Sequence, residues 1–239
     1  MRVPTFAALL GTLLVLLAAG LGMGPFGAPD TAASGHVARH YLEHAYHDAH
    51  TPNVVTVMIA DYRSFDTLGE IIVVFTAGLA CALLLLPRGE RGRVPLLLHR
   101  KVNLIAEVIV RVMLPAVQIF AFYVIFHGHY SPGGGFQGGA LLAASILLGR
   151  IVLGRSRSQE IFPTPLGRPL GALGVAVFAG VGLIGFAAGG AFLQYDRMPV
   201  ALAADMLRNW GILGIELGVA MAVMGTLVSI FDDLSVGGR

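Results

Sequence analysis

Residues 169–195 read PLGALGVAVFAGVGLIGFAAGGAFLQY, a run without a single Lys, Arg, Asp or Glu. At about 1.5 Å per residue, a helix of this length crosses the roughly 30 Å hydrocarbon core of a lipid bilayer. We therefore predict a transmembrane helix within residues 170–192. This stretch decides the fold class, because a continuous apolar run of this length is typical of a membrane span.

Uncharged or nearly uncharged runs of similar length recur along the chain. They predict five more transmembrane helices, within residues 4–23 and at about residues 65–86, 104–126, 133–153 and 210–231. The first run follows Arg2 and therefore also has the order of a signal peptide, but no small-residue cleavage pattern follows it and the rest of the chain is itself apolar. We favour a membrane anchor, and we predict an all-α, polytopic membrane protein of about six transmembrane helices.

The composition agrees with a membrane protein and excludes several other classes. Of the 239 residues, 56% are hydrophobic and 13% are charged, and the mean hydropathy is +0.76. The formal net charge of +2 is too small to indicate binding to nucleic acid. Cys81 is the only cysteine, so this chain alone cannot build a disulfide framework or a cysteine-ligated metal or iron-sulfur site. We therefore expect no cofactor, and any redox chemistry would belong to a partner.

The basic residues between the apolar runs predict the orientation in the membrane. One side carries both termini and these basic residues: Arg2, Arg88, Arg91, Arg93, Arg100, Lys101, Arg150, Arg155, Arg157, Arg168 and Arg239. The other side carries only Arg39, Arg63, Arg197 and Arg208. Because loops rich in Lys and Arg stay in the cytoplasm, we expect both termini to be cytoplasmic. The agreement over every loop also favours six helices over five.

A row of histidines lies in the most polar part of the chain, residues 30–66. Its members are three or four residues apart, so one helix face can carry them all: His36, His40, His44, His47 and His50. Such a row can bind a metal, but no cysteine or carboxylate set nearby completes a site. We favour a solvated, amphipathic helix at the membrane surface, and we predict no metal site.

Glycine recurs at intervals that suit close helix packing. Three pairs lie four residues apart: Gly135 with Gly139, Gly185 with Gly189, and Gly214 with Gly218. Small residues at this spacing let helix backbones approach closely in lipid. Any one pair can be incidental, but three pairs in the last three predicted helices favour a tight bundle.

The connection between the third and fourth predicted helices contains the glycine-rich stretch GHYSPGGGFQGG at residues 128–139. It is not a Walker phosphate loop, because no Lys-Ser or Lys-Thr follows the glycines and the predicted topology places it away from the cytoplasm. The stretch resembles the glycine-rich loop of the MnhB subunit of Mrp-type (Mnh) multisubunit sodium/proton antiporters. The resemblance rests on Gly128, His129, Pro132, Gly133, Gly134, Gly135, Phe136, Gly138 and Gly139. It implies an MnhB-like four-helix membrane domain over residues 102–239, in which these glycines and Pro132 form a structural loop.

A second resemblance covers the N-terminal part of the chain. It rests on NVVTV at residues 53–57, DYR at residues 61–63 and FDTLGE at residues 65–70. These segments resemble the C-terminal part of the large MnhA subunit of the same antiporters, and also the small E-type subunit of the related membrane-bound hydrogenases. The resemblance implies a module over residues 1–101, with two transmembrane helices and a polar outer segment.

The two resemblances together imply an accessory membrane subunit of a multisubunit Na+/H+ antiporter in the prokaryotic cell membrane. Its partners would be the bilayer and the other subunits of the complex, with Na+ and H+ as the transported ions, and it would not be an enzyme. The proton-pumping helices with their lysines would lie in larger subunits, because no Lys or His occurs within the helices predicted here.

Charged residues inside the predicted helices are the candidates for an ion route, because an intramembrane charge costs about 2.5–3.5 kcal/mol on insertion scales. Glu107 and Arg111 lie four residues apart and can pair, which favours a structural role over a transporting one. Asp66 and Glu70 have the same spacing near the outer end of the second helix. Glu70 and Glu216 have no evident partner in this chain and lie at a similar depth. We expect them to line the outer half of a hydrated path, with Glu107 in the inner half.

Two other functions stay open. The same modules are attached to redox-driven complexes such as the membrane-bound hydrogenases, so the chain can belong to the ion-translocating arm of such a complex. It can also be a scaffold that only packs the active subunits. We favour the antiporter because both modules resemble antiporter subunits, and co-purifying iron would distinguish the redox complex.

Overall fold

The structure is a computed structural model that describes residues 3–24, 27–28, 31, 33–85 and 104–237. Most of the basic residues on which the predicted orientation rests lie outside these ranges, as does Lys101 at the predicted boundary between the two modules. The described residues form helices and loops without a β-strand, which confirms the prediction of an all-α protein.

The chain divides into two compact units, Met1–Glu43 and His44–Arg239. The first unit contains α1 (Val3–Leu21), the π-helical turn η1 (Ala33–Ala38) and the beginning of α2 (Arg39–Ala49). α1 occupies the stretch predicted as the first transmembrane helix. Its described side chains are exposed and apolar all round, as in a helix that lipid or another subunit surrounds.

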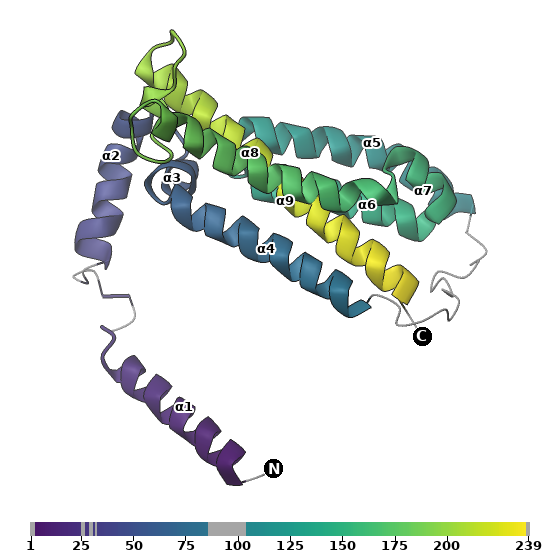
Figure 1. Ribbon diagram of the computed structural model, residues 1–239, viewed down its shortest axis with the longest axis horizontal. Helices are drawn as coiled ribbons and strands as arrows, with labels where there is room; N and C mark the ends of the chain where they lie inside the picture. The colour runs from purple at the N-terminus through teal and green to yellow at the C-terminus, as the bar shows by residue number, and fades with distance from the viewer. Residues whose placement is uncertain (1–2, 25–26, 29–30, 32, 86–103, 238–239) are drawn as a thin grey trace. The chain divides into compact units, whose positions relative to one another are not determined.

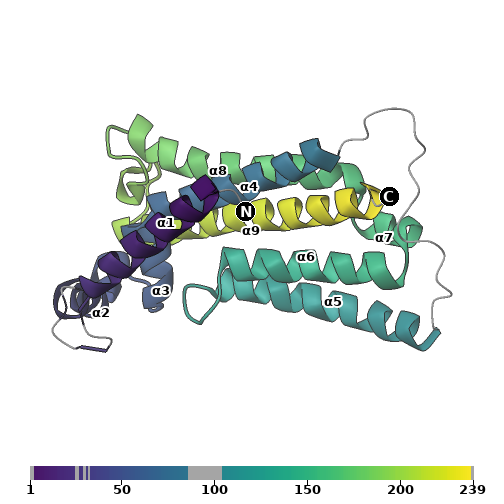
Figure 2. The same ribbon diagram turned by 90° about the horizontal axis from the view of Figure 1, so that it is seen from below.

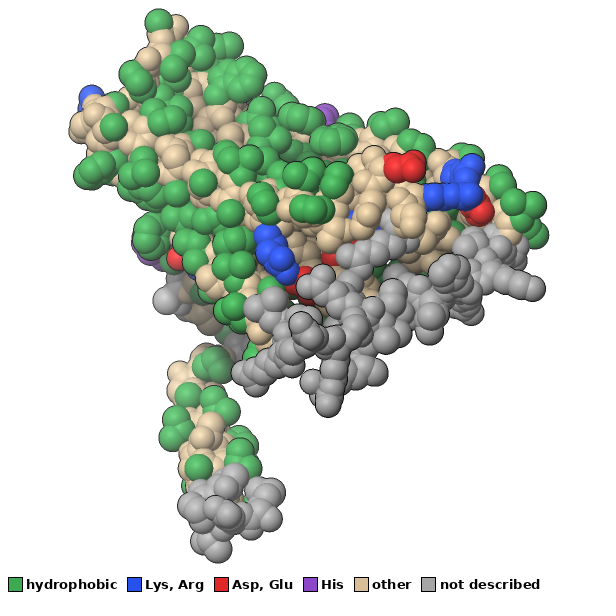
Figure 3. Space-filling model, turned by 45° about the vertical axis from the view of Figure 1, so that its right-hand side comes forward, with side chains coloured by type: hydrophobic (Ala, Val, Ile, Leu, Met, Phe, Trp, Pro, Cys, Tyr) green, Lys and Arg blue, Asp and Glu red, His purple; other side chains and the backbone are tan. Residues whose placement is uncertain are grey.

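The second unit contains the helices that are long and apolar enough to cross a membrane. Among the described residues these are α4 (Ser64–Leu85), α5 (Leu104–His127), α6 (Gly135–Val152), α8 (Gly167–Ala187), which the turn η3 (Thr164–Leu166) precedes, and α9 (Ala204–Gly237). Together with the shorter apolar α1, they match the prediction of about six transmembrane helices. Figure 3 shows a face covered mostly by hydrophobic side chains, on which the charged side chains gather in a few small groups.

Short elements connect the long helices. α3 (Val54–Val57) and the π-helical turn η2 (Met58–Tyr62) lead into α4, α7 (Arg155–Ile161) follows α6, and the 3-10 turn η4 (Tyr195–Arg197) precedes α9. The side-chain oxygen of Asn53 caps α3 by accepting a hydrogen bond from the Val55 N–H at 3.1 Å.

α9 is the central helix of the second unit. It packs against α4, α6 and α8, whereas α5 packs mainly against α6 (Figures 1 and 2). Accordingly, 67% of the apolar window of α9 is buried, compared with 17% for α4. The outer faces of the surrounding helices are therefore left for lipid or for other subunits.

Glycine allows the helices around α9 to approach it closely. A Cβ atom on Gly139 of α6 would lie 2.6 Å from the Ala220 carbonyl oxygen, and one on Gly218 would lie 2.8 Å from the Gly174 carbonyl oxygen of α8. Gly225 meets the backbone of α8 in the same way at Gly171. The pairs beginning at Gly135 and Gly214 therefore form helix contacts as predicted, and Gly171 and Gly174 belong to a contact surface that the predicted pairs did not include.

The prediction for Gly185 and Gly189 is wrong. α8 ends at Ala187, and Gly189 has a φ of +81° with no atom near its Cβ position, whereas Gly185 packs against the backbone of Gln194. Glycine readily adopts the left-handed conformation that ends a helix, so the helix stops short of the predicted residue 192. The chain then folds back, and the Leu193 N–H donates to the Gly182 carbonyl at 3.2 Å.

Candidate functional site

The glycine-rich connection between α5 and α6 forms one wall of the candidate site. Residues 128–134 are not helical, and Gly133 and Gly134 have φ values of +143° and +142°. Side chains rarely adopt this conformation, so glycine is required at both positions. α6 begins immediately afterwards at Gly135.

Glu216 of α9 lies directly against this connection. A Cβ atom on Gly134 would lie 2.7 Å from the Glu216 Oε1 atom, one on Gly128 would lie 3.0 Å from it, and one on Gly135 would overlap the Glu216 backbone carbonyl oxygen. Only 5% of Glu216 is exposed, and its Oε2 atom has no hydrogen-bond partner in the described part of the chain. The glycines therefore make room for a buried carboxylate that is not fully compensated.

His129, in the same connection, is the chargeable group that faces Glu216. Its Nδ1 atom lies 3.8 Å from the Glu216 Oε2 atom, and its Nε2 atom lies 3.2 Å from the Asn209 carbonyl oxygen. Burial lowers the pKa of the His129 imidazole from its ordinary value near 6.5. The prediction that Glu216 has no partner in this chain is therefore wrong. Gly128-His129 belongs to the stretch that carries the first resemblance, but nothing in the sequence indicated that the imidazole turns towards α9.

A cavity of about 240 Å³ lies beside Glu216. α4 contributes Thr67 and Glu70 to its wall, α6 contributes Gln137, and the remaining lining residues are Ile59, Ala60, Gly135, Phe136, Ile215 and Val219. The structure thus brings together two of the predicted carboxylates, Glu70 and Glu216, from helices far apart in the sequence. Glu70 is exposed and Glu216 is buried, so the two line the same space with different access to solvent.

The segment before α4 fixes the glycine connection. The Asn53 Nδ2 atom donates to the carbonyl oxygens of Gly128 and Ser131, both at 2.8 Å, and the Thr56 hydroxyl donates to the Gly128 carbonyl at 2.7 Å. In addition, the Asn53 N–H donates to the His129 carbonyl at 3.0 Å. Asn53 and Thr56 belong to the stretch that carries the N-terminal resemblance, so one of its roles is to hold the loop.

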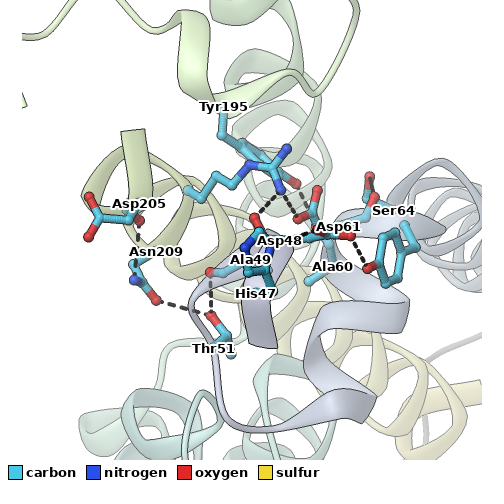
Figure 4. Close-up of polar contacts among 12 residues, drawn as sticks. His47, Asp48, Ala49, Thr51, Ala60, Asp61, Ser64, Tyr195, Asp205 and Asn209 are labelled. Carbon is cyan, nitrogen blue, oxygen red and sulfur yellow. Dashed lines mark hydrogen bonds and ion pairs between the residues drawn. The ribbon is translucent and has the colours of Figure 1, made fainter. Parts of the chain in front are cut away.

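A polar cluster joins the same segment to the beginning of α9 (Figure 4). Arg208 donates to the Asp48 carbonyl at 2.5 Å and to the Asp61 carboxylate at 3.1 Å, and the Tyr62 hydroxyl donates to the Asp48 carboxylate at 2.6 Å. The Tyr62 hydrogen bond lowers the pKa of Asp48, whereas burial raises the pKa of Asp61 against the opposing effect of Arg208. Thr51 bonds the Asn209 side chain at 3.1 Å, which links this cluster to the residue that holds His129.

The glycine connection and the helices around it coincide with a known domain. The model of the domain related to the MnhB subunit of Na+/H+ antiporters matches residues 105–229, more than half of the chain. This chain belongs to the MnhB-related family. A second model, MbhE of the membrane-bound hydrogenase (MBH), matches residues 10–95.

Individual relatives of the MnhB-related chain are components of membrane antiporters. It is 30% identical over 219 residues to a probable K(+)/H(+) antiporter A/B subunit of Rhizobium meliloti (strain 1021), covering 79% of this chain and 22% of that protein. It is 32% identical over 121 residues to a putative antiporter subunit mnhB2 of Staphylococcus aureus (strain Newman), covering 50% of this chain and 84% of that protein. The MnhB-related chain therefore spans about a fifth of the first relative's length.

Two solved structures resemble the MnhB-related chain over nearly its whole length. One is the membrane-bound sulfane sulfur reductase (MBS), an archaeal respiratory membrane complex, with a TM-score of 0.67, 28% identity and 98% of both chains covered. The other is the Mrp complex from Dietzia sp. DQ12-45-1b, with a TM-score of 0.68 and 28% identity, covering all of this chain and 26% of that one.

The other predicted route residues of the MnhB-related chain lie outside the lining of the cavity. Asp66, near the start of α4, pairs with Arg63 at 2.5 Å, and both side chains are exposed. Glu107 pairs with Arg111 at 2.5 Å, as its spacing predicts, and also with Arg157 of α7. These pairs leave Glu70 and Glu216 as the predicted carboxylates that share a space.

The MnhB-related domain also contains a buried ion pair that sequence reasoning missed. Arg150 was assigned to a basic loop, but it lies in α6 with 1% exposed, and its Nε atom is 3.1 Å from the Asp232 Oδ1 atom of α9. Arg150 also donates to the Ser158 hydroxyl at 3.1 Å and to the Phe162 carbonyl at 2.7 Å. The signal was present, because the predicted helix to residue 153 already contained Arg150.

The histidine row of the MnhB-related chain lies on η1 and α2, except for His50, which follows α2. Across the ranges that the structure describes, no three His, Cys, Asp or Glu side chains are placed to hold a metal ion.

Proposed function

We propose that this chain is an accessory membrane subunit of a multisubunit Na+/H+ antiporter. The observation that carries the proposal is the match of residues 105–229 to the MnhB-related domain, over helices that enclose a buried, incompletely compensated carboxylate beside a cavity. Charges of this kind persist in membrane helices at substrate and ion pathways. The partners are then the other subunits and the surrounding lipid, and the chain itself is a transporter component that catalyses no reaction.

Glu70 and Glu216 form the central part of the ion route in this proposal. Both line one cavity, and Gln137 and Thr67 add oxygen atoms that suit a hard cation. Asp66 lies one helical turn before Glu70 on α4, where it can attract cations to the cavity. Glu107 and Arg111, at the far end of α5 from the glycine connection, serve the other half of the route.

We further propose the chain's organisation and its placement in the membrane. Residues 1–101 and 102–239 are two modules of separate ancestry, because different family models match residues 10–95 and 105–229. The chain lies in the prokaryotic cell membrane with both termini in the cytoplasm, as the distribution of Lys and Arg indicates.

A redox-driven complex is the second candidate. It is favoured by the structural match to the sulfane sulfur reductase complex, which covers 98% of both chains, and by the match to MbhE. Iron and acid-labile sulfide in the purified native complex distinguish the two: an antiporter contains neither, whereas a redox complex contains both in stoichiometric amounts.

The route is tested by Glu70→Gln and Glu216→Gln in the complete complex. Glutamine keeps the size and hydrogen bonding of glutamate but removes the charge, so we expect normal assembly on native gels and loss of Na+-dependent proton movement in everted vesicles. Glu160→Gln, at an exposed carboxylate of α7, is the matched control and should leave exchange unchanged. Wild-type exchange in both assembled route variants would reject the route.

A further inference from the structure

The imidazole of His129 and the carboxyl group of Glu216 are set apart from the other ionisable pairs of the described chain by being buried without a hydrogen bond between them. The side chain of His129 is 8% exposed and that of Glu216 is 7% exposed. Their facing atoms, Nδ1 and Oε2, are 3.8 Å apart, which is too long for a hydrogen bond and short enough for a proton to pass after a small closure or through one water.

The second ring nitrogen of His129 determines what its first one can do. The Nε2 atom lies 3.2 Å from the Asn209 carbonyl oxygen, which can only accept, so Nε2 carries a hydrogen. In the neutral imidazole, the Nδ1 atom is then a free acceptor directed at the Glu216 carboxyl group. Asn209 and Glu216 lie seven residues apart on α9, so one face of one helix positions both groups.

Each element around Glu216 contributes a defined set of groups. The titratable ones are His129 from the glycine connection and Glu70 of α4, which lines the same cavity. α6 presents Gly135 and Gln137, η2 presents Ile59 and Ala60, and α8 meets the neighbouring turns of α9 with Phe178 and Val181. Asp61 and Arg208 pair with each other two turns earlier along α9. His129 is therefore the base that faces Glu216, and Glu70 is the second acid across the cavity.

We propose that His129 and Glu216 together hold one proton, and that a monovalent cation entering the cavity displaces it. In the protonated state, the carboxyl O–H is directed at Nδ1. When the cation binds the carboxylate, the O–H bond breaks, the proton leaves to water in the cavity, and His129 stays neutral with its Nε2–H on Asn209. The pair therefore carries one positive charge, as a proton or as a cation, and never both. This inference rests on the proposed function and assigns His129 as the positioning residue of that site.

The glycine connection supports this assignment. Gly128 and Gly134 approach the Oε1 atom so closely that a Cβ atom on either would touch it, which fixes the carboxyl group with Oε2 towards His129. Asn53 and Thr56 hold the backbone of the connection on its other side. The imidazole and the carboxyl group are thus held on independently anchored segments, and such positioning favours proton exchange between them.

The test is carbodiimide labelling of Glu216 in the purified complete complex, measured by mass spectrometry as a function of pH. Carbodiimides react with protonated carboxyl groups, so labelling reports the proton directly and needs no ion exchange. In the wild-type complex, we expect labelling to fall with rising pH, and NaCl or KCl to suppress it relative to choline chloride. Labelling that neither cation suppresses would overturn the competition.

His129→Gln separates proton sharing from a structural role. The glutamine amide can donate to the Asn209 carbonyl in place of Nε2, but it cannot take a proton. Without a basic acceptor, the protonated carboxyl group is less stable, so we expect the labelling midpoint to fall by about one pH unit, a tenfold change in proton affinity. The cation concentration that half-suppresses labelling should fall by a similar factor. An unchanged midpoint would reduce His129 to a structural tether.

Two further variants complete the experiment. His129→Asn also lacks a titratable group and replaces His129→Gln if that variant does not assemble, with the same expected shift. His127→Gln is the matched control, because His127 is two residues away and stacks on Tyr123 with ring centroids 4.8 Å apart. Its midpoint should equal that of the wild type, and an equal shift in both histidine variants would contradict the proposal. Absence of Na+-driven exchange in the wild-type complex would reject the proposed function while leaving the labelling result valid.

Discussion

α9 carries two buried carboxylates that the protein treats differently. Asp232 is enclosed by Arg150, whose Nε and Nη2 atoms lie 3.1 and 3.2 Å from its two oxygens. Glu216, sixteen residues earlier and about 24 Å away along the helix, faces a histidine at 3.8 Å and a cavity. The Arg150–Asp232 pair is closed, with hydrogen bonds to α7 and the segment after it, whereas the His129–Glu216 pair is open.

The difference separates a structural charge from a functional one within a single helix. A buried ion pair with complete partners is costly to break and offers nothing for an ion to bind. A buried carboxylate with a neutral acceptor beside it can accept a proton or a cation. Three changes to the chain test this distinction, from the largest expected effect to the smallest.

Removing one partner of the closed pair should have the largest effect. Arg150→Met leaves the Asp232 carboxylate buried without a cation, which costs about 3–5 kcal/mol. We expect low abundance of the assembled complex and a markedly lower thermal dissociation temperature in detergent. Arg168→Met is the control, because the Arg168 side chain is half exposed in its pair with Asp233, and its loss should cost about 1 kcal/mol or less. Equal losses in the two variants would mean that burial does not distinguish the pairs.

Crowding the open pair through the backbone should have an intermediate effect. Gly135→Ala would place a Cβ atom in the Glu216 backbone carbonyl oxygen, so α6 and α9 must separate at the cavity at a cost of about 1–3 kcal/mol. Gly180→Ala in α8, where no atom lies within 4 Å, should be neutral or slightly stabilising. Thermal dissociation of the purified complex measures both, and a stable Gly135→Ala complex would show that the glycine contact is dispensable.

Acid should destabilise the open pair by the smallest amount. Burial lowers the pKa of His129 in the folded protein, so below about pH 6.5 the unfolded chain binds a proton that the folded chain does not. Stability from this group is therefore intact above pH 6.5 and declines as the pH falls towards the lowered value, by at most about 1.4 kcal/mol per pH unit. The difference in dissociation temperature between about pH 8 and pH 5.5 should shrink in His129→Gln. An unchanged difference would exclude His129 as its source.

The helices were predictable from the sequence because lipid imposes a simple length and composition on each span. α4 and α5 begin and end within one residue of the predicted limits. α9 is longer than predicted at both ends, since its charged and polar residues pair inside the protein and need no water. α8 is shorter, because glycine conformation overrides apolar composition at its end.

The site was less predictable than the helices. The similar depth of Glu70 and Glu216 follows from counting residues, but which helix faces meet depends on packing between segments far apart in the chain. His129 and Arg150 were missed for the same reason: each lies near a predicted helix end, where a charge is ordinarily solvated. Only the three-dimensional contacts with α9 distinguish them from surface residues.

The central position of α9 has a consequence for biogenesis. α4, α6 and α8 precede α9 in the chain, so a ribosome delivers them to the membrane before the helix against which all three pack. Until α9 inserts, the glycine surfaces of α6 and α8 border lipid and the loop has no carboxylate to enclose. A nascent chain that stops short of α9 therefore exposes an incomplete bundle to membrane proteases, and insertion of this one helix is the step that commits the protein to assembly.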